Sequence, residues 1–206
     1  MPRQYAILTG DLIASSAMSA AQLDAAFDAL QRAASRMADW DGQITTGFGR
    51  RGGDGWQFAA EHPARALRYA LMLRAELRCL GKTHATRIAI ATGPGTLPPD
   101  HDPNGAHGAG FIDSGRLLEG LPAHVGMAHA SGGALGAAVR LADHISAGWT
   151  PAQARAMREM LWPRSRIRAE AAAALGITRQ AVNQALWSAG FPALSDALDL
   201  IEGDTP

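Results

Sequence analysis

The heptapeptide Arg-Arg-Gly-Gly-Asp-Gly-Trp at residues 50–56 decides how the first part of this 206-residue chain folds. It lies between two runs in which apolar residues alternate with polar or small ones, Gln43–Phe48 and Trp56–Ala59. Such alternation is typical of β-strands, and glycine tolerates the backbone conformations that tight turns require. The stretch therefore predicts a β-hairpin whose tip presents the carboxylate of Asp54 beside two arginines.

A second acid, Asp11, ends the first apolar run of the chain, Tyr5–Asp11. If this run is a strand beside the hairpin, Asp11 and Asp54 can share a Mg²⁺ ion, which prefers oxygen ligands and is often held by one or two carboxylates together with phosphate. Taken singly, each acid is an ordinary residue for a strand end or a turn. The glycines that flank the two acids are candidate ligand contacts: Gly10, Gly53 and Gly55.

The remainder of residues 1–148 alternates between helical and strand patterns. Apolar spacing predicts helices at about 19–40, 63–80, 111–119 and 133–146, and strands at 86–91 and 124–129. The order β-α-β-β-α-β with later additions is typical of an α+β, ferredoxin-like sandwich, with helices on one face of an antiparallel sheet. Residues 93–110 form a long loop in which His101, Asp102 and His107 lack regular metal-ligand spacing, so a polar loop is favoured there over a metal cluster.

Thr150-Pro151-Ala152-Gln153 is a capping box with proline at the first helical position. From this point only helical patterning appears, so we place a domain boundary between residues 148 and 149. The predicted organisation is an α+β domain over 1–148 and a small all-α domain over 149–206.

Within the second domain, residues 168–186 match a helix-turn-helix. Ala172 is a small residue where the helices cross, Gly176 lies at the turn, and Thr178 can cap the second helix. The expected apolar anchors are Leu175, Ile177, Val182 and Leu186. The candidate DNA contacts are Thr178, Arg179, Gln180, Asn183, Gln184, Arg166 and Arg168, whose side chains can bond base edges or phosphates. The competing interpretation is an ordinary helical hairpin made from alanine-rich sequence.

Charge is polarised within this domain although the whole chain is balanced. Lysine plus arginine and aspartate plus glutamate each number 19, so net charge indicates no class of partner. Residues 155–179 carry six arginines and two glutamates, whereas residues 180–206 carry four acids and neither lysine nor arginine. This asymmetry predicts a phosphate-facing side and an acidic outer side.

Cysteine usage and hydropathy predict the compartment. The single cysteine, Cys79, cannot form an internal disulfide and fits a reducing cytoplasm. The N-terminus lacks a signal pattern, and no apolar run reaches transmembrane length. We therefore expect a soluble cytoplasmic protein with no membrane partner.

Four of these segments together resemble the core of class III nucleotidyl cyclase catalytic domains: residues 10–11, 53–55, 87–93 and 108–119. With a C-terminal helix-turn-helix, the arrangement is similar to SatD-family proteins of bacteria. The resemblance implies that Asp11 and Asp54 are metal ligands. It also implies that Arg50 falls where cyclases place a base-recognising lysine. Arg116 falls where an arginine reaches the triphosphate, usually from the partner subunit of a head-to-tail dimer.

Besides the arginine that replaces a lysine at position 50, a planar fork in place of a point charge, the chain departs from the cyclase pattern at two further positions. Ile112 lies where cyclases carry a ribose-orienting asparagine, and Gly105 lies where a base-selecting acid is expected. Isoleucine neither donates nor accepts a hydrogen bond, so the loss of this positioning contact should cost orders of magnitude in rate. The departures favour nucleotide binding without turnover, or a different metal-dependent phosphate reaction, over full cyclase activity.

These observations predict a DNA-binding regulator in which the cyclase-like domain forms a homodimer and binds a nucleotide with Mg²⁺ as effector, while the helix-turn-helix binds DNA. The competing hypothesis is an enzyme, a metal-dependent nucleotidyl cyclase or nucleoside-triphosphate hydrolase. In that case Arg50 and Arg116 would neutralise the phosphates and the tail would be an accessory helical module. A scaffold with an inactive cyclase-like site is the third hypothesis.

Overall fold

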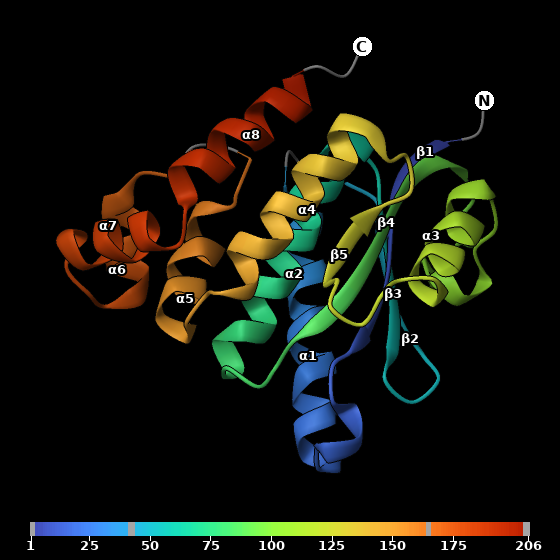
Figure 1. Ribbon diagram of the computed structural model, residues 1–206, viewed down its shortest axis with the longest axis horizontal. Helices are drawn as coiled ribbons and strands as arrows, with labels where there is room; N and C mark the ends of the chain where they lie inside the picture. The colour runs from blue at the N-terminus through green and yellow to red at the C-terminus, as the bar shows by residue number, and fades with distance from the viewer. Residues whose placement is uncertain (1–2, 41–43, 164–165, 204–206) are drawn as a thin grey trace.

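The computed structural model describes residues 3–40, 44–163 and 166–203, and it has an α+β fold (Figure 1). A five-strand mixed sheet with helices is followed by a C-terminal helical region. In spatial order the strands are β2 (Thr46–Arg51), β3 (Gly55–Ala60), β1 (Arg3–Leu12), β4 (Thr86–Gly95) and β5 (Met127–His129). The neighbouring strands are antiparallel except for β4 and β5, which are parallel.

Helices cover both faces of the sheet. On one face lie α1 (Ala20–Ala38), α2 (Ala66–Leu80) and α4 (Gly133–Ala147), while α3 (Ala109–Glu119) lies on the other (Figure 1). The expectation of helices on one face of an antiparallel sheet is therefore wrong for α3 and for β5. The reason is that the chain crosses over through α3 before it returns as β5, which requires a parallel pairing. Short 3-10 turns occur at Ser15–Ala17 (η1), Pro63–Arg65 (η2) and Pro103–Gly105 (η3).

The two faces of β1 have different chemistry because successive side chains in a strand point in opposite directions. Ala6 and Leu8 belong to the large core beneath α1 and α2. Tyr5 and Ile7 form a second, smaller cluster with Phe111 of α3. Thr9 and Asp11 continue the row of Tyr5 and Ile7 toward the end of β1, and both are polar. The sheet therefore presents polar side chains next to α3.

The C-terminal region comprises α5 (Pro151–Met160), α6 (Arg168–Leu175), α7 (Arg179–Ser188) and α8 (Phe191–Gly203). The predicted capping box is confirmed, because Thr150 Oγ1 accepts from the Gln153 amide at 3.3 Å and the Gln153 side chain accepts from the Thr150 amide at 2.7 Å. Helix α5 packs on α2. The predicted boundary falls between α4 and α5, but one connected cluster of buried apolar side chains extends from β1 to α8.

Buried ion pairs reinforce this contact. Glu76 of α2 and Glu159 of α5 are both buried, and the arginines that pair with them come from three segments: Arg36, Arg158 and Arg166. Arg68 of α2, also buried, holds Asp199 and Glu202 of α8. None of the helices in the described ranges is long and apolar enough to cross a membrane.

Candidate functional site

The hairpin forms at the predicted place. Strands β2 and β3 pair antiparallel, with Arg51 opposite Gly55, so residues 52–54 make the turn. Gly52 has φ of 61°, a left-handed conformation that favours glycine. Of the predicted first strand of the hairpin, Gln43 lies outside the described residues, and β2 itself begins at Thr46.

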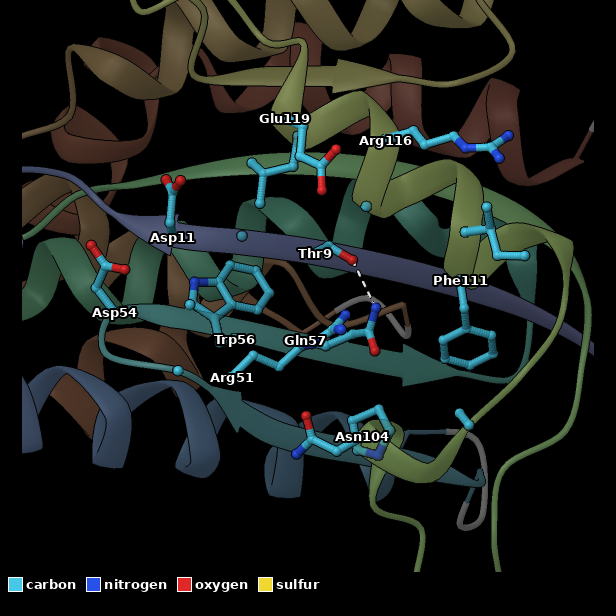
Figure 2. Close-up of a pocket in the computed structure, with 18 of the residues that line it drawn as sticks. Thr9, Asp11, Arg51, Asp54, Trp56, Gln57, Asn104, Phe111, Arg116 and Glu119 are labelled. Atoms are coloured by element: carbon cyan, nitrogen blue, oxygen red, sulfur yellow. Dashed lines mark hydrogen bonds between the residues drawn. The ribbon is translucent and has the colours of Figure 1, made fainter.

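The two predicted metal ligands, Asp11 and Asp54, converge at the tip of this hairpin. Asp11 is the register partner of Gly55, and the Leu12 amide donates to the Asp54 carbonyl at 3.1 Å. Figure 2 shows the two carboxylates side by side at one end of a cleft. Both carboxylates also raise the pKa of Arg87 by their charge, so both lie near the same guanidinium. The chain thus brings together two acids that are far apart in sequence.

Each carboxylate already has a protein partner. Arg87 Nε donates to Asp11 Oδ1 at 2.9 Å, and Arg87 Nη2 donates to Asp11 Oδ2. Asp54 Oδ2 accepts from the hydroxyl of Ser15 in η1. The pKa of Arg87 is raised chiefly by its hydrogen bonds to Asp11, an effect that exceeds the opposing effect of its burial. The acid pair is therefore an ordered cluster with a built-in cation.

A cleft of about 850 Å³ extends from these acids along α3. Thr9 and Gln57 line the cleft, and a directional chain of hydrogen bonds runs from Gln57 to Thr9 (2.9 Å, drawn in Figure 2), from Thr9 to the buried Ser114 (2.8 Å), and from Ser114 to the Phe111 carbonyl (3.1 Å). Because that carbonyl can only accept, each hydroxyl in the chain donates toward α3. Thr9 and Gln57 are not among the site residues predicted from the sequence. Each lies two positions along its strand from Asp11 or Gly55, and alternate residues of a strand share a face, so both could have been predicted.

Of the two arginines in the hairpin, Arg51 lines the cleft and Arg50 does not. The guanidinium of Arg50 lies 4.2 Å from the centre of the Phe27 ring on α1, and it donates to Asp24 at 3.4 Å and to the Gly53 carbonyl at 3.0 Å. Adjacent strand residues face opposite sides of a sheet, so only one of the two arginines can face the ligand. The predicted phosphate contact Arg50 therefore lies on the opposite side from the cleft.

Helix α3 supplies the opposite wall. Phe111, Ile112, Arg116 and Glu119 all line the cleft. Arg116, a predicted phosphate contact, is exposed, and Figure 2 shows its side chain directed away from Asp11. Ile112 is 55% exposed, so an apolar side chain stands at the cleft edge where a hydrogen-bonding residue was expected from the resemblance.

The three candidate glycines have different surroundings. A Cβ atom at Gly10 would lie 2.3 Å from the Trp56 ring, so Gly10 is required by packing beneath that indole. A Cβ atom at Gly55 would lie 2.6 Å from the Arg51 carbonyl oxygen. Gly53 has nothing within 4 Å and lines the open cleft. Of these three glycines, Gly53 has open space beside its Cα where a ligand can approach.

The acid pair suits a cation that arrives with other ligands. In the described ranges, no three or more histidine, cysteine, aspartate or glutamate side chains lie close enough to hold a metal. Asp102 of the long loop instead accepts from the Asn104 amide at 2.9 Å and caps η3. Mg²⁺ commonly uses one or two carboxylates and completes its octahedron with phosphate and water. Asp11 and Asp54 fit that use of Mg²⁺.

The two helices predicted to bind DNA are α6 and α7. Gly176 between them has φ of 64°, and Thr178 Oγ1 accepts from the Ala181 amide at 3.2 Å as the cap of α7. Val182 and Leu186 anchor α7 in the core, whereas Ile177 is 45% exposed, so its predicted anchoring role is wrong. A left-handed glycine turns the chain at Gly176, and this directs Ile177 outward before α7 begins.

The predicted DNA-contacting side chains divide into two groups. Thr178, Arg179, Gln180 and Gln184 are exposed on α7, while Asn183 is half-buried. Arg166 donates to Glu159 at 2.5 Å and lies over the Trp162 ring at 5.0 Å, so its guanidinium is used within the protein. Arg168 is half-buried at the first residue of α6.

A scan of the chain against models of known protein families found no match, and a search of curated proteins found no similar sequence.

Proposed function

We propose that the chain is a DNA-binding regulator in which α7 is the recognition helix and the cleft takes a nucleotide with Mg²⁺ as effector. The observation that carries the proposal is the construction of α7. It is capped at Thr178, anchored by Val182 and Leu186, and it presents Arg179, Gln180 and Gln184 to solvent. Such side chains at the N-terminal end of an exposed helix can bond base edges in a major groove.

The position of α7 also supports DNA binding. Helices α6 and α7 lie at one end of the molecule, away from the sheet (Figure 1). A left-handed glycine and a capped second helix are the local features that a helix-turn-helix requires. In a homodimer, two-fold symmetry would place two copies of α7 on successive turns of one DNA groove, about 34 Å apart.

The cyclase-like assignment of the first domain has support from topology. The order β2-β3-β1-β4, with α1 and α2 on one face, is that of a ferredoxin-like sandwich. The convergence of Asp11 and Asp54 in this frame agrees with the resemblance to class III nucleotidyl cyclases and SatD-family proteins. Ile112 at the cleft edge offers no hydrogen bond, which favours binding over turnover. The half-buried Cys79, whose pKa is raised to about 11 by burial, suits a cytoplasmic protein with an inert thiol.

Fluorescence anisotropy with labelled genomic fragments tests the DNA proposal. The full chain should bind, its affinity should fall as salt rises, and Arg179→Ala should weaken binding and reduce the salt slope by about one. Arg32→Ala, which removes an exposed arginine of α1, is the matched control and should bind like the wild type. Absence of binding at low salt, or an unchanged slope in Arg179→Ala, would remove α7 as the recognition helix.

The second candidate is a metal-dependent nucleotidyl cyclase or nucleoside-triphosphate hydrolase, and the convergence of Asp11 and Asp54 favours it. When bound, Mg²⁺ would neutralise phosphate charge and activate a nucleophile. Arg51 and Arg116 line the same cleft and carry the positive charge that phosphate ligands require. Incubation with each nucleoside triphosphate and Mg²⁺ or Mn²⁺, followed by chromatography, separates the candidates. Turnover that Asp54→Asn abolishes would establish the enzyme, whereas thermal stabilisation by nucleotide without turnover would establish the effector role.

A further inference from the structure

We propose that Arg87 is the built-in counter-ion of the Asp11–Asp54 pair and makes this pair bind a divalent cation only together with a phosphate group. The inference rests on the proposed nucleotide site and deepens it, because it states which form of ligand the site accepts. That form is a phosphorylated compound already chelating its metal, such as a nucleoside di- or triphosphate.

The contact between Arg87 and Asp11 is fixed by the sheet. The two residues are register partners on β4 and β1, so the backbone holds their side chains on the same face. The guanidinium makes the two-bond fork described above, and its Nη1 donates to the Leu121 carbonyl at 3.4 Å. The side chains of Arg87 and Asp11 are 29% and 21% exposed, so the pair is sheltered but not sealed from solvent, and Asp11 lines the cleft.

Charge decides what this cluster can bind. Two ionised acids carry two negative charges, and Arg87 reduces the sum to one. A free divalent cation that approaches Asp11 meets a guanidinium of the same sign and two carboxylate oxygens that already accept hydrogen bonds. A guanidinium repels a divalent ion at contact distance, and this repulsion is stronger at a protein surface than in bulk water because the effective dielectric constant is lower. The protein alone should therefore hold the free ion weakly.

A phosphate group changes this balance. Its negative charge offsets the guanidinium, and its oxygens fill coordination positions that two carboxylates leave open. The planar fork of an arginine matches phosphate as well as carboxylate, so Arg87 can exchange or share partners. Cation and phosphate thus favour each other at this site. A divalent cation alone leaves the site with excess positive charge, and a phosphate alone leaves it with excess negative charge.

Isothermal titration calorimetry of the full chain tests the inference. The three probes are Mn²⁺ alone, tripolyphosphate alone, and the preformed Mn²⁺–tripolyphosphate complex. The wild type should bind the complex at least about tenfold more tightly than either component. Arg87→Gln keeps an amide that can bond Asp11 but removes the charge, and Arg87→Met removes both. Either variant should bind Mn²⁺ alone about tenfold more tightly than the wild type and should lose most of the preference for the complex.

Two controls keep the result interpretable. Arg32→Met removes an exposed arginine of α1 and should retain the wild-type preference. Circular dichroism of each variant checks folding, and Arg87→Gln serves if Arg87→Met does not fold.

The outcomes separate the inference from the proposed site. If Arg87→Gln keeps the wild-type preference within twofold while Asp54→Asn loses binding of the complex, the site stands and the role of Arg87 is wrong. If no probe binds the wild type or any variant, the nucleotide–metal site itself is wrong, and the role of Arg87 with it. Tight binding of free Mn²⁺ by the wild type would also overturn the inference.

Discussion

Gly10 shows how one residue beside the acid pair is dictated by packing. The indole of Trp56 lies against its Cα and donates to Thr86 Oγ1 at 3.0 Å. A methyl group at Gly10 would lie 2.3 Å from the ring and 2.5 Å from the Arg87 carbonyl oxygen. Because the ring is buried and the second obstacle is backbone, we expect Gly10→Ala to lower the free energy of unfolding by about 2–4 kcal/mol, measured by urea denaturation.

Gly53→Ala is the matched control, because nothing lies within 4 Å of a Cβ atom at Gly53. Its free energy of unfolding should change by less than about 0.5 kcal/mol. Equal stability of the two variants would show that Trp56 does not rest on Gly10 in solution.

His129, at the end of β5, should make the stability of the protein depend on pH. Its Nδ1 accepts from the Ser131 amide at 3.1 Å, so in the neutral ring the proton belongs on Nε2. That Nε2 is buried without a hydrogen-bond partner among the described residues. Burial lowers the pKa of His129. The folded protein therefore favours the neutral ring.

The sign of the pH effect follows from this lowered pKa. As pH falls below about 6.5, the unfolded chain takes up a proton that folded His129 does not, so the free energy of unfolding should fall by up to about 1.4 kcal/mol per pH unit until the folded pKa is reached. His129→Asn should remove this part of the slope between pH 7 and 5 in urea titrations, whereas His124→Asn, at an exposed position, should keep it. Identical slopes in the wild type and His129→Asn would contradict the assignment.

At the scale of the elements, α7 depends on its cap. The hydroxyl of Thr178 satisfies the Ala181 amide, one of the donors that the start of a helix leaves without an intrahelical partner. Thr178→Ala should therefore lower the free energy of unfolding by about 1 kcal/mol. Thr178→Ser keeps the oxygen and should cost less than half as much. Equal losses in urea denaturation of the two variants would mean that the methyl group, not the cap, matters.

Helix α3 shows how one element serves two surfaces. Phe111 faces Tyr5 and Ile7 in the small apolar cluster, while Ile112 and Glu119 stand at the cleft. Ser114 connects the two surfaces, because its hydroxyl passes the hydrogen-bond chain that begins at Gln57 on to the Phe111 carbonyl. The contacts that pack α3 on the sheet therefore also fix the position of the cleft wall.

At the scale of the whole molecule, the described residues share one core. Apolar side chains of α2, α5 and α7 join in a single buried cluster, and the acids Glu76 and Glu159 within it are held by arginines from separate segments. Losing a partner of a buried acid is costly, because the remaining charge stays desolvated. The helical region and the sheet should therefore support each other.

We expect the full chain to unfold in one cooperative transition. Far-ultraviolet circular dichroism and tryptophan fluorescence should give the same urea midpoint, because Trp40 and Trp56 of the sheet domain and Trp149 before α5 are buried in the same core. Two separate midpoints would instead show that residues 149–206 fold as an independent domain.

Local patterns in the sequence determined much of this protein. Period-two alternation and glycines predicted a hairpin over residues 43–59, close to the observed strands at 46–60, and apolar spacing predicted α1, α2 and α4 within a few residues. Capping chemistry predicted the starts of α5 at Thr150 and of α7 at Thr178. These features were accessible because caps, turns and amphipathic faces depend on residues only a few positions apart.

Only the tertiary structure decided how distant residues meet. The strand registers placed Asp11 beside Asp54 and paired it with Arg87, and they turned Arg50 away from the cleft in favour of Arg51. The docking of α5 on α2 likewise committed Arg166 to Glu159. A one-residue shift in strand register would move the side chains of Asp11, Arg50 and Arg87 to the other face of the sheet, and register is set by the packing of the whole sheet against its helices, not by any segment alone.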